Sequence, residues 1–348
     1  MKRLVIVVGA GASAEVGLPV GAGLTKSVQK LLEYSASGRG RPDRGDETIF
    51  NAISERARPD NSMQQYLAAC ERIRRGMLQA KSIDNFIDSN QDDPKIAACG
   101  KLAIASAILS AERDSDLFSD HTRANSRIDF EKVRDTWYGR FFDMINEHCL
   151  IEDVPARLAR ITIICFNYDR CIEHFLLGAL QNYYSCTASV AIDAIRRMTI
   201  YHPFGVVGLL PAFSTERATD VPFGIEPHWG HLRSAADQLR TFTEGVSDDD
   251  MLSNIRSRLR SADLLLFLGF AYHPQNLKLL FGDGGSEDAT SVRQVLGTAF
   301  GMSDYAANSI RARIERAIHP TDLVVLDTTL KCAEIFRTFS PDLTLTDA

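Results

Sequence analysis

The chain lacks several features that would place it in familiar protein classes. It has no C-x-x-C pair, and its cysteines are odd in number and irregularly spaced, which argues against a disulfide framework and a zinc ribbon. No apolar run approaches the length of a membrane-spanning helix. The net charge of −6 is mild, so the chain lacks the basic surplus of proteins that coat nucleic acid or anionic membranes. Reduced, buried thiols are the simplest interpretation of the seven cysteines, Cys70, Cys99, Cys149, Cys165, Cys171, Cys186 and Cys332.

The first residues superficially mimic a signal peptide. In MKRLVIVVGAGASA, basic residues precede an apolar run and an Ala-x-Ala sequence. The apolar core has only five strong residues and leads directly into glycines, so a first β-strand explains it better. We therefore expect a cytoplasmic protein.

Composition and periodicity predict an α/β fold. With 348 residues, of which 45% are hydrophobic and 24% charged, the chain can form one large domain or two ordinary ones. Strands alternate with helices, which is typical of a Rossmann-like parallel sheet with helices on both faces. Strand patterns occupy residues 4–8, 161–166, 199–201, 264–268 and 323–326. Helical patterns occupy residues 13–34, 63–77, 96–109, 130–145, 251–259 and 310–317. The first of these is expected to be broken early, by Gly17, Pro19 and Gly21.

The long region between the first two strands has no strand pattern of its own. Residues 35–48 are polar and rich in glycine, as exposed loops are, and helical patterns follow. We predict that residues 35–150 form a helical subdomain. It is inserted into a sheet-forming domain made of residues 1–34 and 151–348.

The most informative stretch is residues 4–19, LVIVVGAGASAEVGLP. A β-branched run leads into Gly9 and Gly11, and a helical pattern begins near Ser13. Strand, glycine turn and helix in this order are typical of phosphate-binding sites. Gly9-x-Gly11-x-x-Ala14 also fits the dinucleotide fingerprint, with a purely structural glycine turn as the alternative.

A hydride-transfer enzyme is a poorer fit to this pattern. Its dinucleotide unit continues with a second strand that ends in an acidic residue about 20 residues past the glycines. Glu33 stands near that distance, but it lies on a helical pattern followed by a polar loop. The missing strand therefore argues against hydride transfer.

Candidate site residues follow three of the later predicted strands. Asn167 and Asp169 come after the second strand, where α/β sheets bind ligands, although both residue types also cap helices. His202 stands in a turn after the third strand, where a lone histidine is more often structural. Gly269 and Phe270 follow the fourth strand.

Taken together, these elements resemble the sirtuin-like superfamily. That family begins with a strand and G-A-G-x-S-x-x-x-G-[IL]-P. It continues with an N-x-D element, a catalytic histidine in an H-G turn, and a strand that ends in G-x-S or G-[FY]. The resemblance covers roughly residues 1–34 and 160–330. The matching residues are Gly9, Ala10, Gly11, Ser13, Gly17, Leu18, Pro19, Asn167, Asp169, His202 with Phe204 and Gly205, Gly269 and Phe270.

The departures from the family pattern indicate one branch of it. Protein-deacylating sirtuins carry a four-cysteine zinc module and an F-R pair, whereas this chain has no C-x-x-C and has Val20-Gly21 after its G-L-P. Their N-I-D is N-Y-D here, and their H-G is H-P-F-G. The N-Y-D form and the helical insertion resemble bacterial sirtuin-like (SIR2-like) proteins of anti-phage defence, members of which cleave NAD to ADP-ribose and nicotinamide. The resemblance implies an NAD glycohydrolase that acts by abortive infection through NAD depletion.

The resemblance also implies a role for each matching residue. The pyrophosphate of NAD would be cradled by Gly9, Ala10, Gly11 and Ser13. Asn167 would position the ribose and the attacking water, and Asp169 would contact the nicotinamide carboxamide or order the loop. His202 would act as general base, a task suited to an ordinary pKa of about 6.5. Gly269 would leave room for the adenosine ribose, with Phe270 beside it in the cofactor-binding set. NAD is then the substrate, and no metal is implied.

Other functions stay open from the sequence. A catalytically silent module could sense NAD or ADP-ribose, and protein deacylation is disfavoured by the missing zinc cysteines. Direct binding of nucleic acid is disfavoured as well, because short basic runs are usually solvated faces. Those runs are Arg39, Arg41 and Arg44, and Arg72, Arg74 and Arg75.

Members of the resembling branch are commonly controlled by a partner or a bound signal. We therefore expect a homo-oligomer and a separately encoded regulatory partner, such as a translocase ATPase or a nucleic-acid-sensing protein. No direct contact with a membrane is expected.

Overall fold

A parallel sheet organises the chain in the computed structural model, which describes residues 2–34, 44–120, 126–214, 220–242, 244, 248–282 and 290–345. In these ranges six strands form one sheet in the order β3-β2-β1-β4-β5-β6. They are β1(Leu4–Val8), β2(Ile161–Cys165), β3(Thr199–Tyr201), β4(Leu264–Leu268), β5(Gln294–Thr298) and β6(Leu323–Asp327). This order is that of dinucleotide-binding Rossmann folds, in which the chain reverses direction across the sheet between β1 and β4. The predicted α/β fold class is confirmed.

The three central strands are apolar on both faces and end level with one another. Every residue of β1, β2 and β4 is buried. Val8 at the end of β1 pairs with Cys165 of β2 on one side and with Leu268 of β4 on the other. The residues that follow these strands therefore meet at one edge of the sheet.

Strand β5 is the one strand that the sequence patterns did not predict. Its sequence, QVLGT, contains two polar residues and a glycine, which weaken a strand pattern. A Cβ on Gly297 would lie 2.6 Å from the Tyr272 hydroxyl, so the glycine is needed for packing. The strand forms because it pairs along its length with β4 and β6.

Alternate residues of the central strands face two different layers of helices. Val5 and Val7 of β1 pack with the layer that contains α14(Asp249–Ser261), α15(Pro274–Phe281) and α16(Asp304–Ile318). Leu4 and Ile6 pack on the opposite layer. That layer contains α7(Phe130–Val133), α8(Trp137–Asn146), α9(Val154–Leu158), α10(Cys171–Tyr184), α11(Ala188–Ile195), α17(Cys332–Thr338) and α18(Ser340–Leu343).

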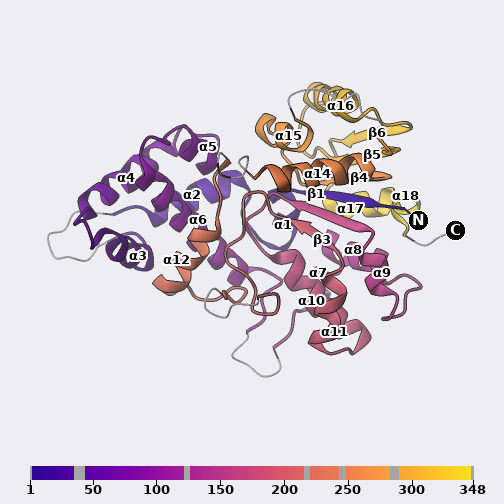
Figure 1. Ribbon diagram of the computed structural model, residues 1–348, viewed down its shortest axis with the longest axis horizontal. Coiled ribbons are helices and arrows are strands. Elements are labelled where there is room, and N and C mark those ends of the chain that lie inside the picture. The colour runs from indigo at the N-terminus through magenta and orange to yellow at the C-terminus, as the bar shows by residue number, and fades with distance from the viewer. Residues whose placement is uncertain are drawn as a thin grey trace.

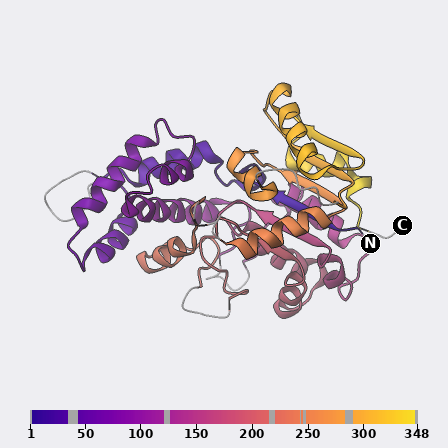
Figure 2. The same ribbon diagram turned by 45° about the horizontal axis from the view of Figure 1, so that its top comes forward.

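A second group of helices, here called the helical lobe, lies to one side of the sheet (Figure 1). It contains α2(Gly21–Leu31), α3(Glu47–Ala57), α4(Met63–Gly76), α5(Ile83–Asp88), α6(Pro94–Asp114) and α12(Trp229–Gln238). Contrary to the sequence expectation that no apolar run approaches the length of a membrane span, helix α6 is long and apolar enough to cross a membrane by length and composition. It is largely buried as the core helix of the lobe. The turned view shows it running from the lobe toward the sheet (Figure 2).

The break expected near Gly17, Pro19 and Gly21 is present. The chain from residue 10 is divided into α1(Ala10–Ser13), a short 3₁₀ turn η1(Ala14–Val16) and α2, because Gly17 has a left-handed φ of +96° and Pro19 follows. One other arrangement differs from the sequence patterns. Helices α7 and α8 fall inside the predicted insertion but pack against the sheet, whereas α12 from outside it joins the lobe. The predicted boundary of 35–150 stays a prediction.

Part of the loop expected at residues 35–48 lies outside the described residues. That part covers residues 35–43 and includes Arg39 and Arg41 of the first basic run. The expectations for these positions therefore stay predictions.

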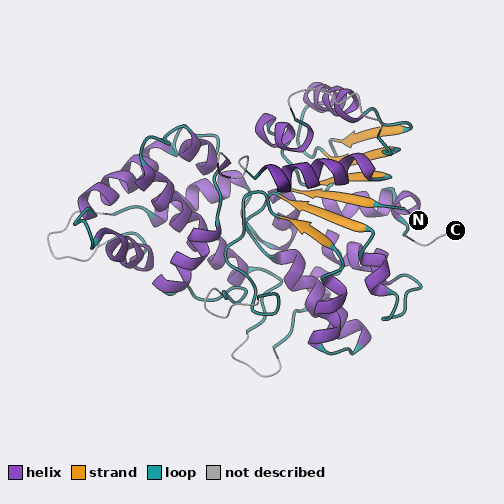
Figure 3. Ribbon diagram, in the orientation of Figure 1, coloured by secondary structure: helices purple, strands orange, loops and turns teal. Residues whose placement is uncertain are grey.

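The carboxyl ends of the strands face the helical lobe (Figure 3). Ligands of open α/β sheets bind beyond the carboxyl ends of the strands, at the point where the strand order reverses. The fold therefore directs attention to the turns after β1, β2, β3 and β4.

Candidate functional site

The turn after β1 packs directly on the turn after β4. The Gly9 N–H donates to the carbonyl of Leu268 at 2.9 Å, and the Gly11 N–H donates to that of Gly269 at 3.0 Å. A Cβ on Gly9 would lie 2.6 Å from the Gly269 oxygen. Gly269 has a φ of +56°, and a Cβ there would lie 2.1 Å from the Ala12 nitrogen. Close packing of two backbones therefore explains these glycines, whatever the turn binds.

The Asn167 side chain is fixed to this glycine turn. Its Nδ2 donates to the Gly9 carbonyl at 3.0 Å and to the Ser13 hydroxyl at 2.8 Å. The residue is 7% exposed, so the amide is held in place below the surface. Its two donors are directed at the turn, which leaves the amide oxygen as the acceptor available to another partner.

Ser13 links Asn167 to Asp169. Its hydroxyl accepts from Asn167 at 2.8 Å and lies 3.5 Å from the Tyr138 hydroxyl, and it acts to lower the pKa of the Asp169 carboxyl. Burial raises the pKa of Asp169, and hydrogen bonds from Ser13 and from the Cys171 N–H partly oppose that shift. Because Ser13 is 2% exposed, its contacts are those of a residue that orients other side chains. The predicted contact of Ser13 with pyrophosphate stays a prediction.

His202 follows β3 and pairs with Glu173 in the first turn of α10. His202 Nε2 lies 2.9 Å from Glu173 Oε1. The Cys165 thiol at the end of β2 contacts the same imidazole and donates to the Asn167 carbonyl at 3.9 Å. Within the described ranges, His202 Nδ1 and Glu173 Oε2 are buried without a hydrogen-bond partner. Each side chain of the pair thus has one polar atom available for a further contact.

The pair changes what His202 can do at neutral pH. Burial alone would lower the pKa of the imidazole, but the Glu173 carboxylate and the Cys165 thiol hold that pKa well above its usual range. Burial acts to raise the pKa of Glu173, yet His202 keeps it below its usual value. The pair is therefore imidazolium and carboxylate near neutral pH, not the neutral imidazole of ordinary pKa expected from the sequence.

A cavity of about 520 Å³ opens on the other side of the glycine turn, beside the ends of β4 and β5. Ala10, Gly11 and Phe270 are among its lining residues. At its rim the Lys331 ammonium lies 5.6 Å from the centre of the Phe300 ring, which is 58% exposed. The cavity thus combines backbone, apolar surface, the Lys331 cation and the acidic Glu15, whose carboxylate accepts the N–H groups of Trp137 and Ala333. Space, apolar surface and a few polar groups are typical of a pocket for a small ligand.

The structure brings most of the predicted site residues to the edge of the sheet between β1, β2 and β4. Hydrogen bonds join Gly9, Gly11, Ser13, Asn167, Asp169 and Gly269, and the cavity adds Ala10 and Phe270. His202 lies one strand further away and reaches this group through Cys165. Neither Asn167 nor His202 is among the described lining residues of the cavity.

Sequence reasoning missed Glu173 and Lys331 as site residues. An acidic residue in the first turn of a helix is usually explained by the helix dipole, so Glu173 gave no separate signal. Lys331 comes more than 300 residues after the glycine turn in the chain, and no motif marked it. Only the fold shows that these residues adjoin His202 and the cavity.

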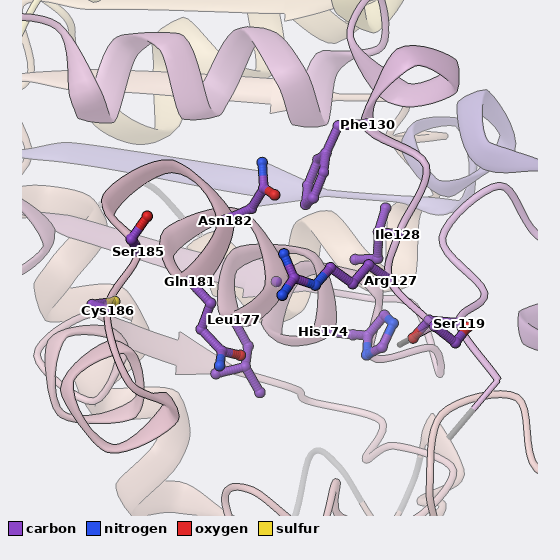
Figure 4. Close-up of a pocket in the computed structure, with 12 residues that line it drawn as sticks. Ser119, Arg127, Ile128, Phe130, His174, Leu177, Gln181, Asn182, Ser185 and Cys186 are labelled. Carbon is purple, nitrogen blue, oxygen red and sulfur yellow. The ribbon is translucent and has the colours of Figure 1, made fainter. Parts of the chain in front are cut away.

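A different cavity of about 540 Å³ lies beside α10, with Arg127 and His174 among its lining residues (Figure 4). His174 there has structural partners. Its Nε2 lies 3.0 Å from the Leu117 carbonyl, and its ring stacks on Phe223 with centres 3.9 Å apart. None of the predicted site residues is among the described residues that line this cavity.

No protein-family model matches the chain, and no curated protein matches it. A search of the described residues also finds no group of three or more His, Cys, Asp or Glu side chains that could hold a metal ion. The site is therefore interpreted from its own geometry and from the motifs of the sequence.

Proposed function

We propose that the chain is a sirtuin-like NAD glycohydrolase, which cleaves NAD to ADP-ribose and nicotinamide. The observation that carries the proposal is the Asn167 amide, which Gly9 and Ser13 hold at the carboxyl edge of a sheet with Rossmann strand order. The His202–Glu173 pair lies one strand away. An oriented amide and an acid–base pair thus lie on one side of the turn that a dinucleotide is expected to cross.

NAD would lie across the point where the strand order reverses. The adenosine and pyrophosphate half would occupy the cavity beside β4 and β5, where Lys331 supplies positive charge for a phosphate. The nicotinamide ribose would then reach the ends of β2 and β3. Phe270 lines the cavity, and its ring lies 5.0 Å from that of Phe166 after β2, so the two sides of the site are in contact.

The proposed reaction breaks the bond between ribose C1′ and the nicotinamide nitrogen. The electron pair of that bond leaves with nicotinamide, which departs as a neutral molecule, and the ribose becomes oxocarbenium-like. The oxygen of a water molecule adds to C1′ and passes its proton to His202. Asn167 would hold the water and the ribose in place, a positioning effect that can supply several kcal/mol of the rate enhancement.

The raised pKa of His202 makes this step dependent on pH. An imidazolium cannot accept a proton, so the rate should rise as the pH approaches the pKa of His202 from below. The same observation favours one alternative, a module that binds NAD or ADP-ribose near neutral pH without cleaving it.

Nicotinamide release from NAD by the full chain, measured from about pH 6 to about pH 10, separates these two functions. We expect turnover by the wild-type protein and a loss of at least about 100-fold in His202→Ala. The matched control is His148→Ala, at an exposed histidine, which should keep the wild-type rate. Binding of NAD without release at any pH would establish the silent module. Wild-type turnover by His202→Ala would remove His202 from the mechanism.

Four further proposals rest on no contact in the structure: the cytoplasmic location comes from the sequence, and the other three come from the resemblance. We place the protein in the cytoplasm, as an effector of anti-phage defence that acts by NAD depletion. It would assemble with copies of itself and answer to a separately encoded regulator. Light scattering after size-exclusion chromatography tests the assembly, since a fully active monomer would contradict it.

A further inference from the structure

The segment Asn167–Arg170 is held on two sides by different parts of the molecule. Asn167 and Asp169 bind the glycine turn through Gly9 and Ser13, as described above. Tyr168, between those two residues, and Arg170, after them, bind the helical lobe. Alternate residues of one short segment therefore connect the candidate site to the lobe.

The first connection runs through Tyr168. Its hydroxyl donates to Asp84 Oδ1 on α5, and its carbonyl accepts the Val207 N–H at 3.0 Å. Tyr168 is only 7% exposed, and its ring belongs to the core that the lobe shares with one face of the sheet. The tyrosine of the N-Y-D sequence is thus fixed at its tip by the lobe.

The second connection runs through Arg170, which is 2% exposed and pairs with the fully buried Glu112 at the end of α6. Glu112 accepts from both the side chain and the backbone N–H of Arg170, the latter at 3.3 Å. Arg170 Nη1 also donates to the Gly208 carbonyl at 3.1 Å, and Glu112 accepts the Gly224 N–H at 3.1 Å. A buried ion pair with this many hydrogen bonds is costly to break, so it fixes the backbone at residue 170 firmly.

Arg170 also joins the lobe to the histidine pair. It is the residue that precedes the first turn of α10, and that turn carries Glu173. Glu173 in turn holds His202. The lobe is therefore connected, through Arg170 and the first turn of α10, to the His202–Glu173 pair on which the proposed reaction depends.

We infer that Tyr168 and Arg170 are positioning residues, through which the helical lobe sets the place of Asn167 and Asp169 in the site. This inference rests on the proposed function for its kinetic consequence, but its structural part stands without it. A lobe arrangement that loses the Asp84–Tyr168 or Glu112–Arg170 contact would misplace the Asn167 amide. Misplacement of a reacting group by about 1 Å can cost up to about 100-fold in rate.

Two measurements on the full chain test the inference with conservative variants that keep side-chain size. The variants are Tyr168→Phe, Asp84→Asn, the double variant and Glu112→Gln. The matched control is Glu71→Gln, which removes a carboxylate of the same lobe that pairs with Arg74 and Arg75 at its surface. The first measurement is amide hydrogen exchange of peptides that cover residues 166–171. The second is kcat and KM for nicotinamide release.

We expect faster exchange at residues 166–171 in Tyr168→Phe, Asp84→Asn and Glu112→Gln, with wild-type exchange in Glu71→Gln. We expect kcat to fall about tenfold or more in Tyr168→Phe and Asp84→Asn while KM stays within about threefold, because placement is lost and not binding. The double variant should be no worse than either single one, since both remove the same contact.

The outcomes separate the two proposals. If the wild-type protein releases no nicotinamide, the proposed function fails, and the exchange measurement alone decides the inference. If the wild-type protein turns over and Tyr168→Phe and Asp84→Asn keep its kcat, the inference fails while the function stands. Wild-type exchange at residues 166–171 in all three single variants would overturn the inference in either case.

Discussion

The two sides of the glycine turn differ in chemistry. On the side of β4 and β5, backbone and mostly apolar side chains line a cavity, together with Glu15 and Thr298, and Lys331 lies at the rim. On the side of β2 and β3, buried polar groups form hydrogen bonds with one another, and few of their polar atoms are left without a partner. Asn167 and the His202–Glu173 pair are examples. One side has the space for a ligand, and the other has the fixed polar and charged groups on which the proposed reaction depends.

The glycine turn has contacts on both sides. Gly9 and Gly11 lie against Gly269, and Gly11 and Gly269 line the cavity; the contact of these three glycines is here called the shared floor. The carbonyl of the same Gly9 holds the Asn167 amide on the opposite side. Changes on the cavity side should alter binding, changes on the polar side should alter turnover, and changes at the shared floor should alter stability.

The largest effect is expected at the shared floor, from Gly269→Ala. The change combines a left-handed backbone, which costs about 1–2 kcal/mol for a residue with a Cβ, with a clash at 2.1 Å on the Ala12 nitrogen. We expect the free energy of unfolding to fall by more than about 3 kcal/mol, measured by chemical denaturation. Gly301→Ala is the control, because Gly301 has a φ of +75° and a Cβ there would meet no atom within 4 Å among the described residues. Equal losses in both variants would show that the contact between the two turns is not tight.

A smaller effect is expected on the polar side, from Glu173→Gln. Removing the carboxylate lowers the pKa of His202 toward its ordinary value of about 6.5. The rising limb of kcat/KM with pH, which reports groups of the free enzyme, should therefore shift to lower pH. Exposed Glu152→Gln is the charge-matched control and should keep the wild-type limb. An unshifted limb in Glu173→Gln would show that His202 is not the titrating base.

The same pair makes stability depend on pH. Because the folded pKa of His202 is raised, its contribution is fully present below its ordinary pKa and is lost as the pH rises through the folded value. Because the folded pKa of Glu173 is lowered, its contribution is lost as the pH falls through that value. The stability difference between wild type and His202→Gln should thus shrink toward alkaline pH, as measured by denaturation at several pH values. A difference that grows with pH would contradict the raised pKa.

The smallest effect is expected on the cavity side, from Lys331→Ala. The ammonium lies at the rim, so its loss should raise KM several-fold, by about 1 kcal/mol of binding, and leave kcat unchanged. Lys26→Ala, on the exposed face of α2, is the control and should change neither constant. A fall in kcat with unchanged KM would place Lys331 in the reaction centre and remove the contrast between the two sides.

The sequence predicts well the strands and turns that form the centre of the site. It predicts poorly the strand and side-chain contacts around that centre. Apolar runs and glycines identified β1, β2 and β4, and parallel pairing then requires the residues after them to meet. Strand β5 was not predicted, because pairing with β4 and β6 stabilises it and its own residues give a weak strand pattern. The pKa of His202 and the lobe contacts of Tyr168 and Arg170 depend on residues 29 to 84 positions away, which no local pattern encodes.

The most direct test of the account is NAD turnover by Asn167→Ala, measured as nicotinamide release at the pH of maximal wild-type rate. The control is Asn182→Ala, at an exposed asparagine of α10. We expect turnover by the wild type and the control. We expect a loss of at least about 100-fold in Asn167→Ala, with ADP-ribose still bound in the cavity. Turnover by Asn167→Ala at the wild-type rate would contradict it.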